Sequence, residues 1–283
     1  MNFFSALQDP ANSFLRLALA VGLCSSLAFG IIGTYVVTRR ISYLAGAISH
    51  CVLGGIGAAL WLRHSLALEW LDPVYGALPA ALLAALAVGR FGRSSGQREE
   101  TMIGATWAVG MALGLIFLDF TPGYFNLSSY LFGDILLVSQ ADLYMILGLD
   151  LLIILFVWRF YHPLLAISFD EEFAGLRGLR VKLLYYLLLA LIATTVVLMI
   201  RIVGIVMVIA MLTLPAAAAA IFTHRLYTMM LMTVILSATA VSGGLGLSYG
   251  VGLSSGPIII LLSGFIYVFA ALWKKFKRSL KHG

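Results

Sequence analysis

The sequence predicts an all-α protein that crosses a membrane many times as a bundle of helices. Of its 283 residues, 62% are hydrophobic and 11% are charged, whereas a soluble domain usually has about 25% charged residues. The mean hydropathy of +1.04 leaves too little polar surface to cover a soluble globule. The apolar residues also gather in long runs, and a helix needs about 20 such residues to cross the roughly 30 Å hydrocarbon core of a bilayer.

About nine segments have the length and composition of membrane spans. The expected spans are 13–37, 42–62, 75–89, 101–118, 141–158, 183–200, 204–222, 228–249 and 256–273. The third is short and contains Pro79. As one helix, the stretch 183–222 would be about 60 Å long, twice the membrane core, so we expect a turn near Arg201 and Gly204.

The basic residues alternate between the two sides of these spans. Only Arg63 and Arg201 lie in connections that follow even-numbered spans, and Arg16 begins the first span; every other Lys and Arg follows an odd-numbered span. The positive-inside rule therefore predicts an N-terminus outside and a C-terminus in the cytoplasm. Because topology accounts for the net charge of +6, no nucleic-acid partner is expected, and the partner of the apolar surface is membrane lipid.

The longest connection, at about 159–182, follows the fifth span, which we expect Pro163 to end. Ser168 and Glu171 have the spacing of a capping box, which predicts a short helix over about 169–177. Three adjacent acidic residues begin this helix and would be repelled by anionic lipid, so we expect it to dock a cytoplasmic partner instead of lying on the bilayer. The residues of this expected contact are Ser168, Phe169, Asp170, Glu171, Glu172, Phe173, Gly175 and Gly178.

Two ionisable side chains stand out among the polar groups expected at membrane depth, where ionisable groups usually have a function. His50 lies about eight residues into the second span, roughly 12 Å from its inner end. A neutral imidazole is a good ligand for zinc, manganese or iron, but a core histidine bonded to a backbone carbonyl is an equal alternative. Asp150 lies in the middle of the fifth span, where it either lines a pathway or pairs within the bundle.

The connections expected outside carry acidic residues, among them Asp119 and Asp134. They are either ordinary solvated loop charges or a mildly negative mouth that raises the local concentration of cations.

The motifs of several enzyme classes are absent from the sequence. It contains no GxxxxGK[ST] phosphate loop, HExxH, GxSxG or DxD-type metal cluster, so neither an ATP site nor a resident cofactor is expected on this chain. A membrane enzyme would need a nucleophile, a base and an orienting group together. A secondary cation transporter would need inverted repeats and several charges inside the membrane, and the sequence shows neither pattern clearly.

Five segments resemble, in the same order, the permease subunits of zinc/manganese/iron-type ABC importers. They are RRISYLAGAISHCVLGGIGAAL (39–60), LFGDILLVSQADL (131–143), SFDEEFAGLRGLRV (168–181), RIVGIVMVIAMLTLPAAAAAIF (201–222) and SSGPIIILLSG (254–264). The resemblance extends over about residues 14–273, which is essentially the whole membrane part.

This resemblance implies a single permease domain over 1–283, in the inner or plasma membrane of a prokaryote, that forms a homodimer around a translocation path. Two copies of a separate ABC ATPase would bind ATP and dock on 168–181, so the chain itself would not be an enzyme. An extracytoplasmic metal-binding protein would deliver the ion near Asp119 or Asp134, and the ion would then pass His50.

One position departs from the family pattern. Many members carry an Asp four residues before the signature His, whereas this chain has Gly46. The loss of a hard oxygen ligand, which suits manganese better than zinc, favours zinc as the transported ion and puts an Asp–His site in doubt. A manganese or iron importer of the same family is the alternative, followed by a secondary cation transporter that works without ATP.

Overall fold

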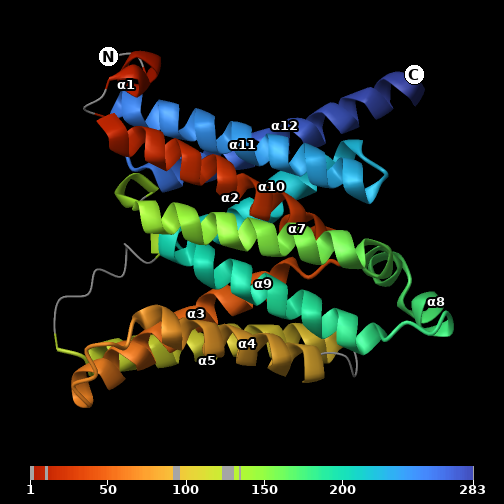
Figure 1. Cartoon of the computed structure of the whole chain (residues 1–283). Helices are drawn as coiled ribbons and strands as arrows, with labels where there is room; N and C mark the ends of the chain where they lie inside the picture. Colours follow the sequence, from red (N-terminus) through yellow and green to blue (C-terminus); the bar gives the residue numbers. More distant parts are fainter. Residues whose placement is uncertain (1–2, 10–11, 92–95, 123–130, 134, 283) are drawn as a thin grey trace. The chain divides into compact units, whose positions relative to one another are not determined.

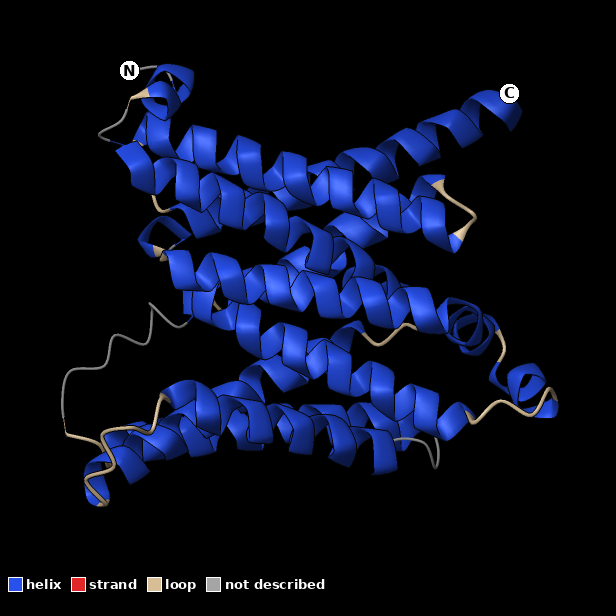
Figure 2. Ribbon diagram, viewed as in Figure 1, coloured by secondary structure: helices blue, strands red, loops and turns tan. Residues whose placement is uncertain are grey.

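A computed structural model of the chain describes residues 3–9, 12–91, 96–122, 131–133 and 135–282. Within these ranges the structure consists of helices and their connections and has no strand (Figure 2), which confirms the all-α prediction. The elements, labelled in Figure 1, are α1 (Phe3–Gln8), α2 (Ser13–Thr38), α3 (Ser42–Ser65), α4 (Pro73–Phe91), α5 (Gly96–Asp119), the 3-10 helix η3 (Ile135–Leu137), α7 (Gln140–Phe169), α8 (Glu171–Leu176), α9 (Val181–Val203), α10 (Ile205–Phe222), α11 (Leu226–Val251) and α12 (Ser255–His282).

The number and order of the expected spans are confirmed. Nine helices of the described part are long and apolar enough to cross a membrane, and they are α2, α3, α4, α5, α7, α9, α10, α11 and α12. The long stretch 183–222 turns where expected. Helix α9 ends at Val203 and α10 begins at Ile205, with Gly204 between them at a φ of +80°, a left-handed conformation that glycine adopts without a steric penalty.

Several helices continue beyond the apolar segments that predicted them. Helix α5 begins at Gly96, before the expected start at 101, and α12 continues from the expected end at 273 to His282. The added residues include Glu, Lys and Arg, which are good helix formers although they do not belong in a hydrocarbon core. Hydropathy therefore indicates the part of a helix that lies within the membrane. It does not indicate where the backbone stops being helical.

The fifth span is interrupted close to Pro163, where the sequence predicted its end, but the chain is helical on both sides of the interruption. Helix α7 consists of two helical segments joined by a kink at Phe160, whose φ of −113° and ψ of 16° are not helical, and the second segment contains Pro163 and reaches Phe169. Proline lacks an N–H group and its ring clashes with the carbonyl of the preceding turn. Here the helix accommodates it by bending, as is common for prolines within long helices.

The chain forms two compact units, and each is described by itself. Unit 1 comprises Met1–Arg40, Leu131–Arg159 and Ile202–Gly283, and unit 2 comprises Ile41–Tyr130 and Phe160–Arg201. Helices α7 and α9 each contribute residues to both units. The single permease domain over 1–283 stays a prediction.

In unit 1, α2 packs against α10 and α11, and α12 packs against the same two helices. A Cβ atom on Gly30 of α2 would lie only 2.8 Å from the Cα atom of Val234 in α11. The hydroxyl groups of Thr34 and Thr233 lie 3.3 Å apart and hydrogen bond across the same helix pair. Close approach through small residues and interhelical hydrogen bonds is typical of membrane helices, because lipid removes the hydrophobic drive for helix association.

In unit 2, α3 packs against both α4 and α5. Gly55 of α3 and Gly76 of α4 face one another so closely that a Cβ atom on either would overlap the carbonyl oxygen of the other. On the side of α5, a Cβ atom on Gly54 would lie 2.7 Å from the carbonyl oxygen of Gly110. Glycines on both sides of α3 thus hold it at short distance from its neighbours, and this packing positions His50 beside α5.

Candidate functional site

A short helix, α8, forms the segment that the sequence singled out for docking. Helix α8 covers Glu171–Leu176, and Asp170 is its N-cap, with a φ of −151° and a ψ of 101°. The carboxylate Oδ1 of Asp170 accepts a hydrogen bond of 2.9 Å from the backbone N–H of Phe173, which satisfies one of the free N–H groups at a helix start. Glu171 and Glu172 lie in the first turn, where negative charge favourably opposes the helix dipole.

The expected capping by Ser168 was wrong. Because α7 continues to Phe169, Ser168 still lies inside that helix, and its hydroxyl donates a 2.7 Å hydrogen bond to the carbonyl of Leu164. Asp170 is the first residue after α7 with an extended backbone, so it and not Ser168 can turn its side chain onto the next helix. The short helix itself is present, at 171–176 within the expected 169–177.

The end of α8 is shaped by Gly178. Its φ is +78°, and its N–H donates a 3.0 Å hydrogen bond to the carbonyl of Gly175. The next N–H, of Leu179, donates a 3.2 Å bond to the carbonyl of Ala174. Such left-handed residues commonly end helices by satisfying the last carbonyls, so the chain here reverses within a few residues and enters α9.

The surface of α8 combines apolar and charged groups. Ala174 is fully buried, whereas the side chains of Phe169, Phe173 and Leu176 are 66%, 49% and 89% exposed. The guanidinium of Arg177 lies over the ring of Phe173, 4.7 Å from its centroid. Exposed aromatic and aliphatic side chains beside acidic residues are a surface that a protein partner can cover, because the apolar area gains from burial and the charges set its orientation.

His50 lies on α3 and stacks on Trp107 of α5. The two ring centroids are 4.4 Å apart and the planes are inclined by 16°. The imidazole is half-buried, and its buried Nδ1 atom has no hydrogen-bond partner within the described part of the chain. The alternative of a core histidine bonded to a backbone carbonyl through this atom is therefore not what the structure shows.

Trp107 was not identified from the sequence, where it is one aromatic residue within an apolar span. The indole ring of Trp107 also packs against Gly46, since a Cβ atom on Gly46 would lie 3.3 Å from the indole atom Cζ3. The neighbouring Cys51 bonds to α5 by a different route, through a 3.0 Å contact from its Sγ atom to the carbonyl of Thr106. Among the described residues no group of three or more His, Cys, Asp or Glu side chains could hold a metal ion.

Asp150 lies in unit 1 and is 6% exposed. Its carboxyl group lies near α2, close to the backbone of Ala28 and to Cys24. One carboxyl oxygen, Oδ1, has no hydrogen-bond partner among the residues described. Of the two other predicted acidic sites, Asp119 is exposed at the end of α5, and Asp134 lies outside the described residues.

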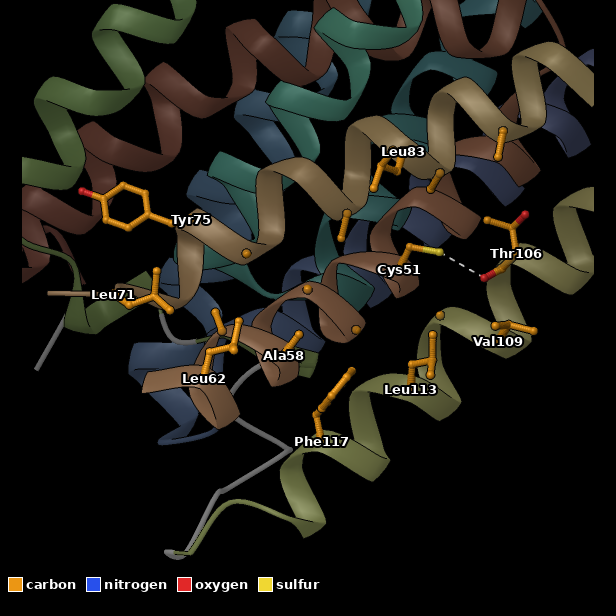
Figure 3. Close-up of a pocket in the computed structure, with 18 residues that line it drawn as sticks. Cys51, Ala58, Leu62, Leu71, Tyr75, Leu83, Thr106, Val109, Leu113 and Phe117 are labelled. Carbon is orange, nitrogen blue, oxygen red and sulfur yellow. Dashed lines mark hydrogen bonds between the residues drawn. The ribbon is translucent and has the colours of Figure 1, made fainter. Parts of the chain in front are cut away.

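Unit 2 also contains an apolar cavity of about 630 Å³ between α3, α4 and α5 (Figure 3). Glycine and alanine residues supply much of its wall, and Figure 3 shows Cys51 and Thr106 at one end and Tyr75 and Leu71 at the other. No carboxylate or imidazole is among its described lining residues. Its polar side chains are those of Cys51, Tyr75 and Thr106, and within the described part of the chain they do not belong to a group of His, Cys, Asp or Glu that could hold a metal ion.

The part of the chain that the structure describes has nine potential spans, an exposed acidic helix between two of them and single polar side chains within the spans. Together these features define a class: the polytopic subunit of a membrane transporter. The profile of the ABC 3 transport family matches residues 11–274. The chain belongs to this family, which confirms the resemblance to zinc/manganese/iron-type ABC importer permeases, and it is a multi-pass protein of a prokaryotic plasma membrane.

Relatives of known sequence and structure agree with this assignment. A probable metal transport system membrane protein of Chlamydia pneumoniae is 38% identical over 254 residues, covering 89% of this chain and 86% of the relative. The manganese import system permease protein ScaB of Streptococcus parasanguinis is 31% identical over 269 residues, covering 95% and 94%. Among solved structures, PsaBC from Streptococcus pneumoniae in complex with Fab superposes with a TM-score of 0.82 at 30% identity, covering 95% of this chain and 94% of that one.

Proposed function

We propose that this chain is the permease of an ATP-driven importer for a divalent metal ion, and that it works as a homodimer with a separate ABC ATPase and an extracytoplasmic metal-binding protein. The observation that carries this proposal is α8. It presents exposed Phe169, Phe173 and Leu176 beside an acidic first turn, and it belongs to a chain of the ABC 3 transport family. Relatives named for metal or manganese transport support the class of cargo.

In this proposal α8 couples the ATPase to the bundle. Asp170 caps the helix at one end and Gly178 ends it at the other, so α8 is a compact element that can move as a body. Only a few residues join α8 to α7 and to α9, and a pull on α8 would therefore act on these two spans. The proposed contact comprises Ser168, Phe169, Asp170, Glu171, Glu172, Phe173, Gly175 and Gly178.

His50 is the proposed contact of the ion within the membrane. Its unpaired Nδ1 atom is a potential metal ligand, and stacking on Trp107 limits how the ring can turn. One imidazole per chain binds an ion weakly. Weak binding suits transport, because an ion that passes through a pathway must also leave it. The topology proposed with this route has the N-terminus outside and the C-terminus in the cytoplasm, with Asp119 and Asp134 near the arrival of the ion.

The exposed face of α5 supports the homodimer. Only 11% of the most apolar stretch of α5 is buried, whereas 72% of the corresponding stretch of α3 is buried. Gly104, Ala108 and Ala112 are exposed at intervals of four residues on α5, and no atom of the described residues lies within 4 Å of a Cβ atom on Gly104. Small residues at this spacing allow two membrane helices to pack closely, so α5 is the helix through which a second copy is proposed to pack, with Trp107 and His50 close by.

Two metal ions, zinc and manganese, are candidates for the transported ion, and each is supported by a different observation. Zinc is favoured by the absence of a carboxylate at Gly46, where the side-chain position abuts Trp107. Manganese is favoured by the similarity to relatives such as the manganese import system permease protein ScaB. Competition between the two ions during transport decides between them.

The test is uptake of radioactive zinc and manganese into proteoliposomes that contain the permease, its ATPase and its binding protein. ATP-dependent uptake that requires both partners is the expected result, and the ion that suppresses uptake of the other at the lower concentration is the cargo. Uptake by the permease alone, without ATP, would instead identify a secondary cation transporter. Binding of the ATPase that survives Phe173→Ala together with Leu176→Ala would remove α8 from the coupling contact.

A further inference from the structure

Helix α12 is longer than a membrane crossing requires. It covers 28 residues, Ser255–His282, which corresponds to about 42 Å at 1.5 Å per residue, compared with a hydrocarbon core of roughly 30 Å. Residues 272–277 are exposed at every successive position, over more than one and a half turns. The end of the helix therefore stands clear of the rest of unit 1 on all sides.

One apolar stripe extends along α12 into this end. Its members recur every three or four residues, and between 52% and 73% of each is exposed; they are Leu261, Phe265, Val268, Leu272 and Phe276. Residues at this spacing share one face of a helix. In a membrane span, an exposed apolar face is suited to contact with hydrocarbon, and the unbroken continuation of the stripe would place the last turns at the edge of the same lipid.

Aromatic residues and lysines meet at this edge. Trp273 stacks on Phe269, with centroids 6.2 Å apart and planes inclined by 30°. Lys274, Lys275 and Lys277 are exposed on the turns around Trp273, and the sequence continues with two more basic residues. Amphipathic aromatic rings are enriched at the level of lipid headgroups, and lysine side chains near a helix end extend their ammonium groups to that level.

The lysines have no acidic neighbours in the helices that hold them. Helices α10 and α11 and the short η3 pack against α12, and none of these elements contains an Asp or Glu; no acidic residue follows Glu172 in the sequence. The positive charge at the end of α12 is therefore not balanced by the elements on which α12 rests.

We propose that the end of α12, formed by Phe269, Trp273, Lys274, Lys275, Phe276 and Lys277, is a binding site for the headgroups of anionic phospholipids. The aromatic side chains lie at the boundary of the hydrocarbon and the ammonium groups bind the phosphates. Clusters of basic residues directly beside a span are attracted to anionic lipid, and the attraction grows with each residue. The stripe that continues from the lipid-facing span favours this occupant over a surface of the ATPase, which would have to cover the same turns at the membrane edge.

The test uses the native Trp273 as a local probe of its lipid neighbours. The other four tryptophans are replaced by phenylalanine, and the full chain is placed in phosphatidylcholine bilayers that contain an equal mole fraction of either brominated phosphatidylglycerol or brominated phosphatidylcholine. Bromine quenches tryptophan fluorescence on contact. We expect quenching by the anionic lipid to be at least about two-fold stronger, because each lysine near an anionic surface favours it several-fold, and to fall towards equality at about 1 M salt.

A matched pair of variants assigns the effect to α12. The variant K274Q/K275Q/K277Q is expected to lose the preference for the anionic lipid, whereas K182Q, which removes the one lysine preceding α12, is expected to keep it. Equal quenching by the two lipids in the parent, or an unchanged preference in the triple variant, would overturn the proposal. The same holds if the triple variant keeps its lipid preference but no longer co-purifies with the ATPase, because α12 would then be an ATPase contact. The measurement needs neither metal nor ATP, so it is independent of the transport function.

Discussion

The imidazole of His50 and the indole of Trp107 form a stacked pair, with ring centroids 4.4 Å apart and an interplanar angle of 16°. The pair joins α3 to α5 and leaves the Nδ1 atom of the imidazole without a hydrogen-bond partner in the described part of the chain. An indole ring that stacks on one imidazole and orients it is compatible with weak binding of a transported ion. It also explains how a lone histidine can have a defined direction within a span.

The pair predicts that His50 and Trp107 act together in transport. His50→Ala should lower ATP-dependent metal uptake by about ten-fold or more, since the loss of one metal ligand or its support commonly costs 10–100-fold. Trp107→Leu should lower uptake less, because the ligand remains but its ring is no longer held, and Trp107→Phe should keep most of the activity. Initial rates in proteoliposomes measure these effects.

The control for this prediction is the amount of folded complex, measured by co-purification of the ATPase with each variant. Unchanged uptake after His50→Ala would exclude the residue from the path. Equal losses in Trp107→Phe and Trp107→Leu would show that stacking by an aromatic ring is not what position 107 supplies.

The capping of α8 by Asp170 predicts a difference between two neighbouring positions. Asp170→Ala removes the carboxylate that accepts from the N–H of Phe173 and should destabilise α8 by about 1 kcal/mol. The expected readout is a lower metal-stimulated ATPase rate in the assembled transporter. Ser168→Ala is the matched control, because that hydroxyl bonds within α7, and it should leave the rate nearly unchanged; the opposite order of effects would mean that Ser168 is the cap.

The end of α8 predicts a similar contrast between two glycines. Gly178→Ala places a side chain at a φ of +78° and should cost about 1 kcal/mol or more, with a matching loss of ATPase coupling. Gly175 has a Cβ position that meets only Val181, at 3.9 Å, so Gly175→Ala should be neutral for the stability of the segment. Proteolysis rates at the α8–α9 connection compare the two variants, and equal rates would contradict the role assigned to Gly178.

The close contact of α3 and α4 predicts a large effect from a single methyl group. Gly55→Ala forces the new Cβ atom onto the carbonyl oxygen of Gly76, and forcing extra atoms into a tight interface typically costs about 1–3 kcal/mol. The thermal midpoint of the purified permease in detergent should therefore fall by several degrees. In Gly148→Ala no atom of the residues that the structure describes lies within 4 Å of the new atom, and alanine is the better helix former, so this control should keep or raise the midpoint. A drop equal to that of Gly55→Ala would mean that backbone contact is not the cause.

The sequence by itself determined the all-α class, the nine spans and their order, the turn at Gly204 and the presence of a short acidic helix near 169–177. These follow from local rules, because a helix in hydrocarbon must satisfy its own backbone groups and glycine alone adopts certain backbone angles freely. The five ordered motifs were enough to indicate the family, which the comparison with known proteins confirmed.

Only the tertiary structure decided what depends on contacts between distant segments. The kinked α7 runs through Pro163 and so moves the cap of α8 from Ser168 to Asp170. The stack of His50 on Trp107, the contact of Gly46 with the same indole and the close approach of Gly55 and Gly76 each join residues at least 20 positions apart in the chain. Hydropathy and spacing describe one helix at a time, whereas these contacts depend on which helix faces which, and steric fit between whole helices decides that.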